Sequence, residues 1–198
     1  MSKTGYSHIK KYTEIYNKCI SDEKRIRGIN RRNINKNEVI SIMGDMRGTL
    51  ESIIGYMIKE TGLTDGQILR IMEDRNIKSE GKKPSLYGRI VALEHIGALS
   101  SGMAHIVHGR IRKPGNNAVH YYEKNPENNL VTAGPGETLR YAEKMYQSIQ
   151  QLTHYFAEDF MVRVRKYEKI GKRKVWLRIF LGAAVIAVLA AIWILTVK

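Results

Sequence analysis

The sequence predicts an all-α protein, a helical bundle followed by one C-terminal transmembrane helix. Apolar residues recur at three- and four-residue intervals along most of the chain, the spacing of helices with one buried face. No stretch shows the repeated alternation of a half-buried strand. Residues 179 to 197 contain no charged residue and no proline, and 19 helical residues nearly span the hydrocarbon layer of a membrane.

The first segment, residues 1 to 34, is basic and has weak helical spacing. No acid occurs among residues 24 to 36, whose arginines are Arg25, Arg27, Arg31 and Arg32. Such a run is usually a solvated arm. Its asparagines add hydrogen-bond donors and keep the segment loop-like, so contact with phosphate groups is the second interpretation.

Residues 37 to 61 are predicted to form the first long helix, with Asn37 as its N-cap. Its apolar positions are Val39, Ile40, Met43, Met46, Leu50, Ile53, Ile54 and Met57. Glu51 lies one residue from this stripe. Its carboxylate is either a surface group or the partner of a basic side chain inside the bundle.

Shorter helices are predicted next. Thr64 and Gln67 have the spacing of a capping box, which starts a helix running to about Ile77. A polar loop follows at 79 to 84, and the apolar residues between 86 and 103 suggest one or two more helices.

The longest predicted loop covers residues 122 to 137 and either gates a site or only connects helices. A long final helix follows, marked by Leu139, Ala142, Met145, Tyr146, Ile149, Leu152, Phe156 and Phe160.

The best clue to chemistry is the string Ile-Arg-Lys-Pro-Gly-Asn-Asn-Ala-Val-His at residues 111 to 120. Arg112, Asn116 and His120 recur every four residues and would form one stripe on a helix. The string resembles the Arg-plus-His signature of the HEPN superfamily. It is closer to an uncharacterised HEPN-like branch, often attached to restriction-type systems, whose mark is an Arg, then Gly-Asn, a small residue and His.

A second stretch agrees with this resemblance, because Arg47 and Glu51 are similar to the Arg-x3-Glu helix upstream of the motif in that branch. The match covers roughly residues 35 to 160, so residues 35 to 162 are taken as the HEPN-like domain. The resemblance implies a bundle of four to five helices, a homodimer whose two motifs share one cleft, and in many members RNA cleavage.

Metal-independent RNA cleavage needs a base, an acid and positive charge on the phosphorane, roles that histidine and arginine can supply. On the resemblance, His120 is the base or acid, Arg112 stabilises charge, and Asn116 orients the phosphate or His120. Arg47 and Glu51 would support them.

A structural interpretation of the same residues stays open. Pro114 is expected to break the helix, so that Arg112 reaches in from outside the new helix. Asn116 and His120 would then only hydrogen-bond within the bundle, and Arg112 would pair with Glu51.

The C-terminal region predicts a membrane anchor. Residues 163 to 178 hold eight basic residues against Glu168, and this collar is expected to stay in the cytoplasm with the N-terminal domain. A collar of this kind attracts anionic lipid headgroups. Trp176 and Trp193 suit the two membrane interfaces, and no secretory signal is seen.

The net charge of +14 implies attraction to polyanions, and the lone Cys19 fits a reducing compartment. No ligand spacing for a metal and no glycine-rich phosphate loop occurs, so no metal or cofactor is expected. The sequence thus predicts a membrane-anchored HEPN-like protein acting in RNA or nucleotide transactions, with endoribonuclease activity in defence or stress as one option. The alternatives are a non-catalytic interaction or sensor module and an effector whose membrane helix perturbs the bilayer.

Overall fold

A computed structural model describes residues 3 to 78, 81 to 123 and 128 to 164, and no strand occurs within these ranges. The predicted all-α helical bundle is therefore confirmed for them. The elements are α1 (Lys3–Gly28), α2 (Lys36–Thr61), α3 (Asp65–Asp74), α4 (Leu86–His95), α5 (Ser101–Ile106), η1 (Val107–Arg112), α6 (Lys113–Val119), η2 (Tyr121–Glu123), α7 (Asn129–Thr132), α8 (Pro135–Tyr155) and η3 (Phe156–Phe160).

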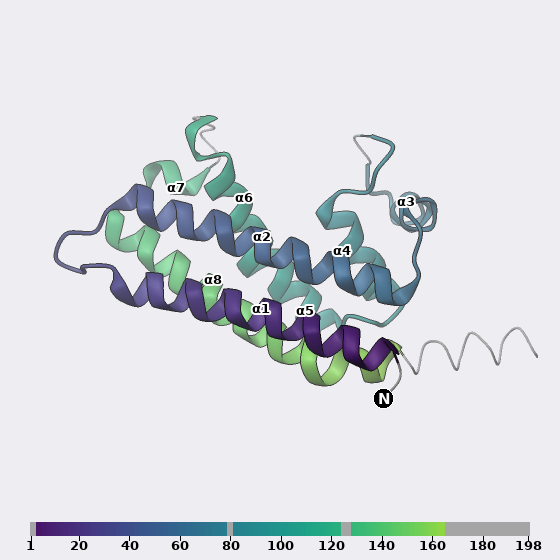
Figure 1. The fold of residues 1–198 in the computed structure, drawn as a ribbon. Helices are drawn as coiled ribbons and strands as arrows, with labels where there is room; N and C mark the ends of the chain where they lie inside the picture. Colours follow the sequence, from purple (N-terminus) through teal and green to yellow (C-terminus); the bar gives the residue numbers. More distant parts are fainter. Residues whose placement is uncertain (1–2, 79–80, 124–127, 165–198) are drawn as a thin grey trace, which may run out of the picture.

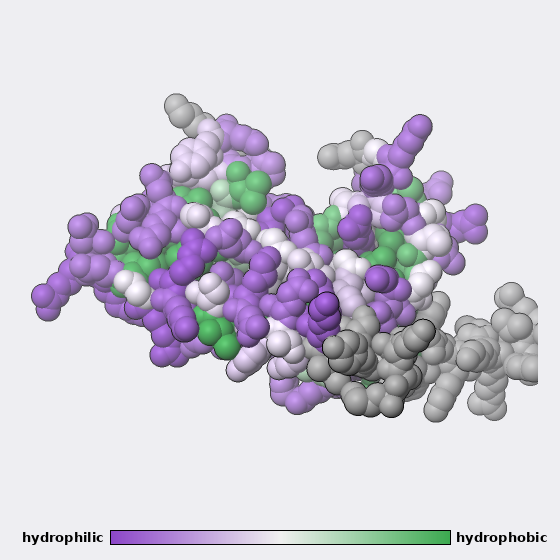
Figure 2. Space-filling model, viewed as in Figure 1, coloured by the Kyte–Doolittle hydropathy of each residue, from purple (hydrophilic) through white to green (hydrophobic). Residues whose placement is uncertain are grey.

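Three long helices, α1, α2 and α8, lie side by side and form the body of the bundle (Figure 1). The helices α3 and α4 pack together near one end of α2, and α6 and α7 cover the other end. The start of α1 and the end of η3 lie at the same end of the molecule. The surface over α1 and α2 is mostly hydrophilic, with small separate apolar patches (Figure 2).

Helix α2 is the centre of the core, because it contacts α1, α4, α6 and α8. Every apolar position predicted for it is buried, so the predicted stripe is confirmed. The predicted N-cap, Asn37, is wrong by two residues, since Asn35 caps the helix and its side-chain oxygen accepts from the backbone N–H groups of Asn37 and Glu38. Asn35 is extended, as an N-cap must be, whereas Asn37 already lies inside the helix.

The predicted capping box is confirmed at α3, where Thr64 and Gln67 bond reciprocally to each other's backbone N–H groups. The helix ends at Asp74, three residues earlier than predicted. Ile68 and Met72 of α3 pack with Ala92 of α4 in a second, smaller apolar cluster.

The predicted loop at 122 to 137 is shorter than expected. The short helix α7, capped by Asn128, lies within it, and α8 begins at Pro135, a residue type suited to the first turn of a helix. The predicted positions of the final helix are buried, except that Tyr146 is half-buried. A π-helical turn, η3, carries the buried Phe156 and Phe160.

Helix α1 corrects the interpretation of residues 24 to 36 as a solvated arm. The helix continues to Gly28, and Ile26 and Ile29 are buried against the bundle. The buried positions of this segment are Ile15, Cys19, Asp22, Ile26 and Ile29, which recur at helical spacing. The periodicity looked weak in the sequence because a charged residue, Asp22, occupies one of the core positions.

Asp22 is a buried acid with an unusual environment. Only 5% of its surface is exposed, and its Oδ2 has no hydrogen-bond partner among the described residues. Burial, with a smaller contribution from Asp45, raises the pKa of the Asp22 carboxyl to about 6, although Arg25 and Lys18 oppose the shift. The folded chain therefore keeps Asp22 protonated up to a higher pH than the unfolded chain does.

We expect Asp22→Asn to raise the free energy of unfolding at pH 8 by about 1 kcal/mol, because the variant does not bury a charge. A raised folded-state pKa gives stability that is present at pH 4 and lost as the pH rises through 6. Thermal melts from pH 4 to 8 should show this loss in the natural chain and a flatter profile in the variant. The exposed Asp74→Asn variant is the control, and a variant at Asp22 that is less stable at pH 8 would contradict the prediction.

No helix in the described ranges is both long and apolar enough to cross a membrane. Residues 165 to 198 lie outside these ranges, and they include the predicted transmembrane helix at 179 to 197 and almost all of the basic collar. The membrane anchor therefore stays a prediction.

Candidate functional site

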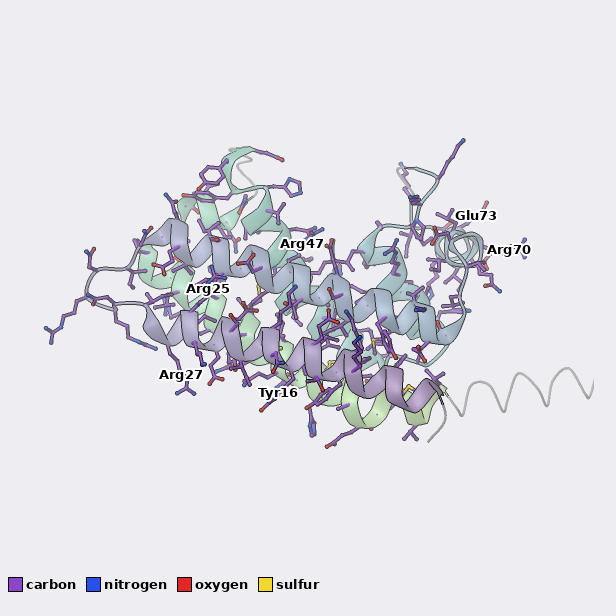
Figure 3. All side chains as sticks on the ribbon, in the orientation of Figure 1. Tyr16, Arg25, Arg27, Arg47, Arg70 and Glu73 are labelled. Carbon is purple, nitrogen blue, oxygen red and sulfur yellow. The ribbon has the colours of Figure 1, made fainter. Side chains whose placement is uncertain are left out.

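The two motif segments of the sequence meet in the bundle. Arg47 on α2 donates from Nε to Oδ1 of Asn116 on α6 at 2.7 Å, and its Nη1 lies 2.8 Å from Oε1 of Glu51. Figure 3 places Arg47 on the edge of α2 that faces α6. Arg47 is partly buried, with 22% of its side chain exposed, and its charge-assisted bond to Asn116 links α2 and α6.

Gly115 allows this close approach of α6 to α2. It is buried, and a Cβ atom placed on it would lie 2.7 Å from Cβ of Arg47 and 3.0 Å from Cε of Met145. Such separations are below ordinary van der Waals contact, so only glycine fits here without a shift.

Pro114 lies in the first turn of a new α-helical element, α6, as predicted, but the predicted break in helical geometry before it is wrong. Lys113 keeps helical geometry, with φ −60° and ψ −54°, and α6 directly continues the preceding element. That element, η1, is a π-helical turn in which the backbone N–H of Lys113 donates to the carbonyl of His108. In a regular α-helix, the ring of a proline clashes with the preceding turn and its missing N–H leaves one backbone hydrogen bond unmade. The wider π-helical turn before Pro114 accommodates both effects.

Arg112, at the end of η1, contacts aromatic side chains. Its Nε donates to Nδ1 of His108 at 3.1 Å, and its guanidinium carbon lies 5.1 Å from the ring centroid of Tyr87. The rings of Tyr87 and His108 are 4.8 Å apart. Burial, together with the charges of Arg112 and Lys113, lowers the pKa of His108, and the neutral imidazole can accept this bond.

The predicted pairing of Arg112 with Glu51 is wrong. Glu51 pairs with Arg47 one turn earlier on the same helix, and Arg112 is held by His108 on its own helix. Burial lowers the pKa of Arg112, with Arg47 adding repulsion and Tyr87 opposing the shift. An arginine nevertheless stays charged in proteins, so Arg112 brings a positive charge to this part of the bundle.

His120 lies at the C-terminal end of α6, away from these contacts. Its Nδ1 is 2.6 Å from Oε1 of Glu123, and 53% of the His120 side chain is exposed. The alternative in which His120 hydrogen-bonds inside the bundle is therefore wrong, because its partner and its ring both lie on the surface. The histidine is exposed to solvent and held by a carboxylate.

Within the described ranges, no side-chain hydrogen bond or ion pair joins any two of Arg112, Asn116 and His120, although the backbone N–H of His120 donates to the carbonyl of Asn116 at 3.0 Å. Arg112 and Asn116 line one cleft, which we call the Arg112 cleft, with a volume of about 670 Å³. Its lining residues are Lys78, Gly81, Lys82, Lys83, Ser85, Tyr87, Arg112 and Asn116. Four of these are cationic and none is acidic. His120 is not among them.

The sequence analysis did not predict the lysines and the tyrosine that line this cleft together with Arg112 and Asn116. The only signal was a pair of adjacent lysines, Lys82 and Lys83, in the polar loop before Pro84. Tyr87 and His108 gave no signal, because their contact with Arg112 depends on how α4 packs against η1.

The four N-terminal arginines predicted as phosphate ligands do not form one free cluster. Arg25 pairs with Asp45, Arg27 with Glu23 at 2.6 Å, and Arg31 with Glu143 at 2.7 Å. Figure 3 shows Arg27 on the outer side of α1 and Arg25 between α1 and α2. Arg32 is exposed and makes no ion pair with any described residue.

Fold and site together define an all-α bundle protein with a cationic cleft beside its motif helix. No protein-family model, curated protein or solved structure matches this chain. In the described ranges, no group of three histidine, cysteine or acidic side chains could hold a metal ion.

Proposed function

We propose that this chain is a membrane-anchored, HEPN-like protein that acts in RNA or nucleotide transactions and binds RNA in the Arg112 cleft. The observation that carries the proposal is the lining of this cleft, where Lys78, Lys82, Lys83 and Arg112 face no acidic neighbour among the described lining residues. Positive charge gathered in a concave site attracts phosphate groups and releases counterions when they bind.

The chemistry of the cleft suits RNA beyond simple charge. The guanidinium fork of Arg112 can bond phosphate oxygens in a bidentate way. Tyr87 offers a ring against which a base can stack, and Asn116 adds an amide. Ser85 caps the N-terminus of α4, whose positive end adds to the attraction for phosphate.

RNA binding is tested with the double variant Lys82→Gln, Lys83→Gln of the full-length chain in non-ionic detergent. We expect its affinity for single-stranded RNA to fall about tenfold at 0.15 M salt. The slope of log affinity against log salt should decrease by about 1.4, since each lysine contributes about 0.7 on a single strand. Fluorescence anisotropy over a salt series measures both quantities.

The matched control is Lys10→Gln, Lys18→Gln, which removes two charges from exposed positions on α1 outside the cleft. It should lose much less affinity than the cleft variant. Equal losses in both variants would show that RNA responds only to total charge, and the cleft would not be the RNA site.

The HEPN-like assignment has two supports. The described ranges form a helical bundle, and the two segments that carry the resemblance are joined by the hydrogen bond from Arg47 to Asn116. Because this bond needs both side chains, it explains why Arg47 and Asn116 occur together in one chain. Homodimer formation rests on the resemblance alone.

The membrane anchor rests on the sequence of residues 179 to 197 and of the basic collar before it. The described chain ends in a helix at Val164, at the start of that collar. On this proposal the bundle is cytoplasmic and the collar lies against anionic lipid. Recovery of the full-length chain in the soluble fraction after cell lysis would exclude the anchor.

A second candidate function, metal-independent RNA cleavage, is favoured by the contact between His120 and Glu123. A carboxylate on Nδ1 orients the ring and fixes its tautomer, leaving Nε2 for proton transfer at an exposed position. Within one chain His120 does not line the Arg112 cleft, so cleavage would need substrate or a second copy to bring them together. If neither brings His120 and the Arg112 cleft together, the chain would be a non-catalytic binding or sensor module at the membrane.

A further inference from the structure

A second groove is lined by residues of η1, α6, α7 and α8. Its volume is about 700 Å³, within the range of pockets that hold small organic ligands. Its lining residues are Gly109, Arg110, Lys113, Pro114, Asn117, Asn129, Tyr141, Lys144, Gln147, Ser148 and Gln151. None of them lines the Arg112 cleft, so we call this site the α8 groove.

The α8 groove is cationic. Arg110, Lys113 and Lys144 are all exposed, and none makes an ion pair with a described residue. None of the lining residues is acidic. The hydroxyl of Tyr141, one of the lining residues, donates to Glu137 at 3.2 Å. The described lining residues of this groove therefore carry three positive charges and no negative charge.

The amide side chains that line the groove suit a nucleobase better than a simple inorganic anion. Asn117 donates from Nδ2 to Oδ1 of Asn129 at 2.8 Å, which holds both amides in place and leaves the Asn117 oxygen available. Gln147 and Gln151 add exposed amides from one face of α8. Amide side chains can bond an adenine edge with donor and acceptor together.

Gly109 is one of the residues that line this groove. A Cβ atom placed on Gly109 would meet nothing within 4 Å, so a larger side chain there would enter open space and not the core.

We propose that the α8 groove binds a free purine nucleoside phosphate, with its phosphates between Arg110, Lys113 and Lys144 and its base against the amides. Charge, amide chemistry and volume each fit this ligand class. The inference uses no residue of the Arg112 cleft, so it can fail while RNA binding stands.

Isothermal titration of the full-length chain in non-ionic detergent with ATP, adenosine and tripolyphosphate tests the proposal. ATP should bind saturably, and adenosine and tripolyphosphate should each bind more weakly, because each keeps only half of the contacts. The double variant Lys113→Gln, Lys144→Gln should raise the Kd for ATP about tenfold or more, through the loss of two charge-assisted contacts.

Two further variants separate the groove from general charge and from folding. Lys59→Gln, Arg140→Gln removes two exposed charges, one of them on α8 itself, outside the groove and should change the Kd for ATP less than about twofold. Gly109→Leu should fill the groove and abolish ATP binding while keeping the melting temperature and the RNA affinity of the natural chain.

Several results would overturn the proposal. They are an absence of saturable ATP binding, an unchanged Kd in the Lys113 and Lys144 variant, or ATP binding by the Gly109→Leu variant at the natural affinity. A loss of ATP binding in the Lys82→Gln, Lys83→Gln variant alone would move the nucleotide to the Arg112 cleft and equally exclude the α8 groove.

Discussion

Replacing His120 with alanine is expected to lower the rate of RNA cleavage about 100-fold or more, the usual loss on removing a general acid or base. The fold should be unaffected, because 53% of the His120 side chain is exposed and its partner, Glu123, is also on the surface. The measurement is a gel assay of full-length protein with chelator present, so that any cleavage is metal-independent. Melting curves of both proteins show whether folding has changed.

Two variants sharpen the result for His120. Glu123→Gln keeps the shape of the partner and removes its charge, so it should lower the rate less than the loss of the imidazole itself. His154→Ala is the matched control. Like His120, His154 is exposed and lies beside a carboxylate, with its Nε2 3.0 Å from Oε2 of Glu158, but it lies on α8 and not on the helix of the motif. An unchanged rate in the His120 variant, or natural protein that cuts no RNA, would remove the enzymatic option and leave RNA binding as the function.

The second large effect is expected for Gly115→Ala, which should lower the free energy of unfolding by about 2 kcal/mol. The added Cβ would lie 2.7 Å from Cβ of Arg47, an atom fixed to the backbone of α2, so α6 must move away from α2. Overpacking of this kind costs about 1 to 3 kcal/mol, and alanine's better helix propensity offsets about 1 kcal/mol at most. The displacement also weakens the bond from Arg47 to Asn116.

Thermal melting should show the Gly115 variant unfolding roughly 4 to 8 °C below the natural chain. Gly109→Ala is the control on the same continuous helix, because its added Cβ meets nothing within 4 Å. It should be as stable as the natural chain or slightly more stable. If the two variants melt together, the close contact between α6 and α2 does not limit stability.

The positions of the catalytic candidates explain why the motif alone was a poor guide to the site. A spacing of four residues correctly places Arg112 and Asn116 along one continuous helical segment, whereas His120 is the C-cap that follows its last residue, Val119. It does not fix which atoms they contact. Arg112 is held by His108, Asn116 by Arg47, and His120 by Glu123, so the three side chains have three different partners, and only Arg112 and Asn116 share a cleft.

The N-terminal segment is a second case in which a local sequence pattern did not predict the contacts of its side chains. The arginines of residues 24 to 36 suggested an arm that reaches phosphate, yet three of the four predicted ligands pair with carboxylates of the chain. Glu143, the partner of Arg31, lies on α8, 112 residues away in the sequence. No local pattern can reveal a pairing over that distance.

The sequence by itself determined the all-α class, the buried stripe of α2 and the capping box of α3, because periodicity and capping depend on neighbours within one or two turns. Only the tertiary structure decided that Lys82 and Lys83 join Arg112 in one cleft, and that Arg47 bonds Asn116 across 69 residues. It also decided that a π-helical turn accommodates Pro114 without a break. These features depend on how helices pack against one another, and packing brings together residues that are remote in the sequence.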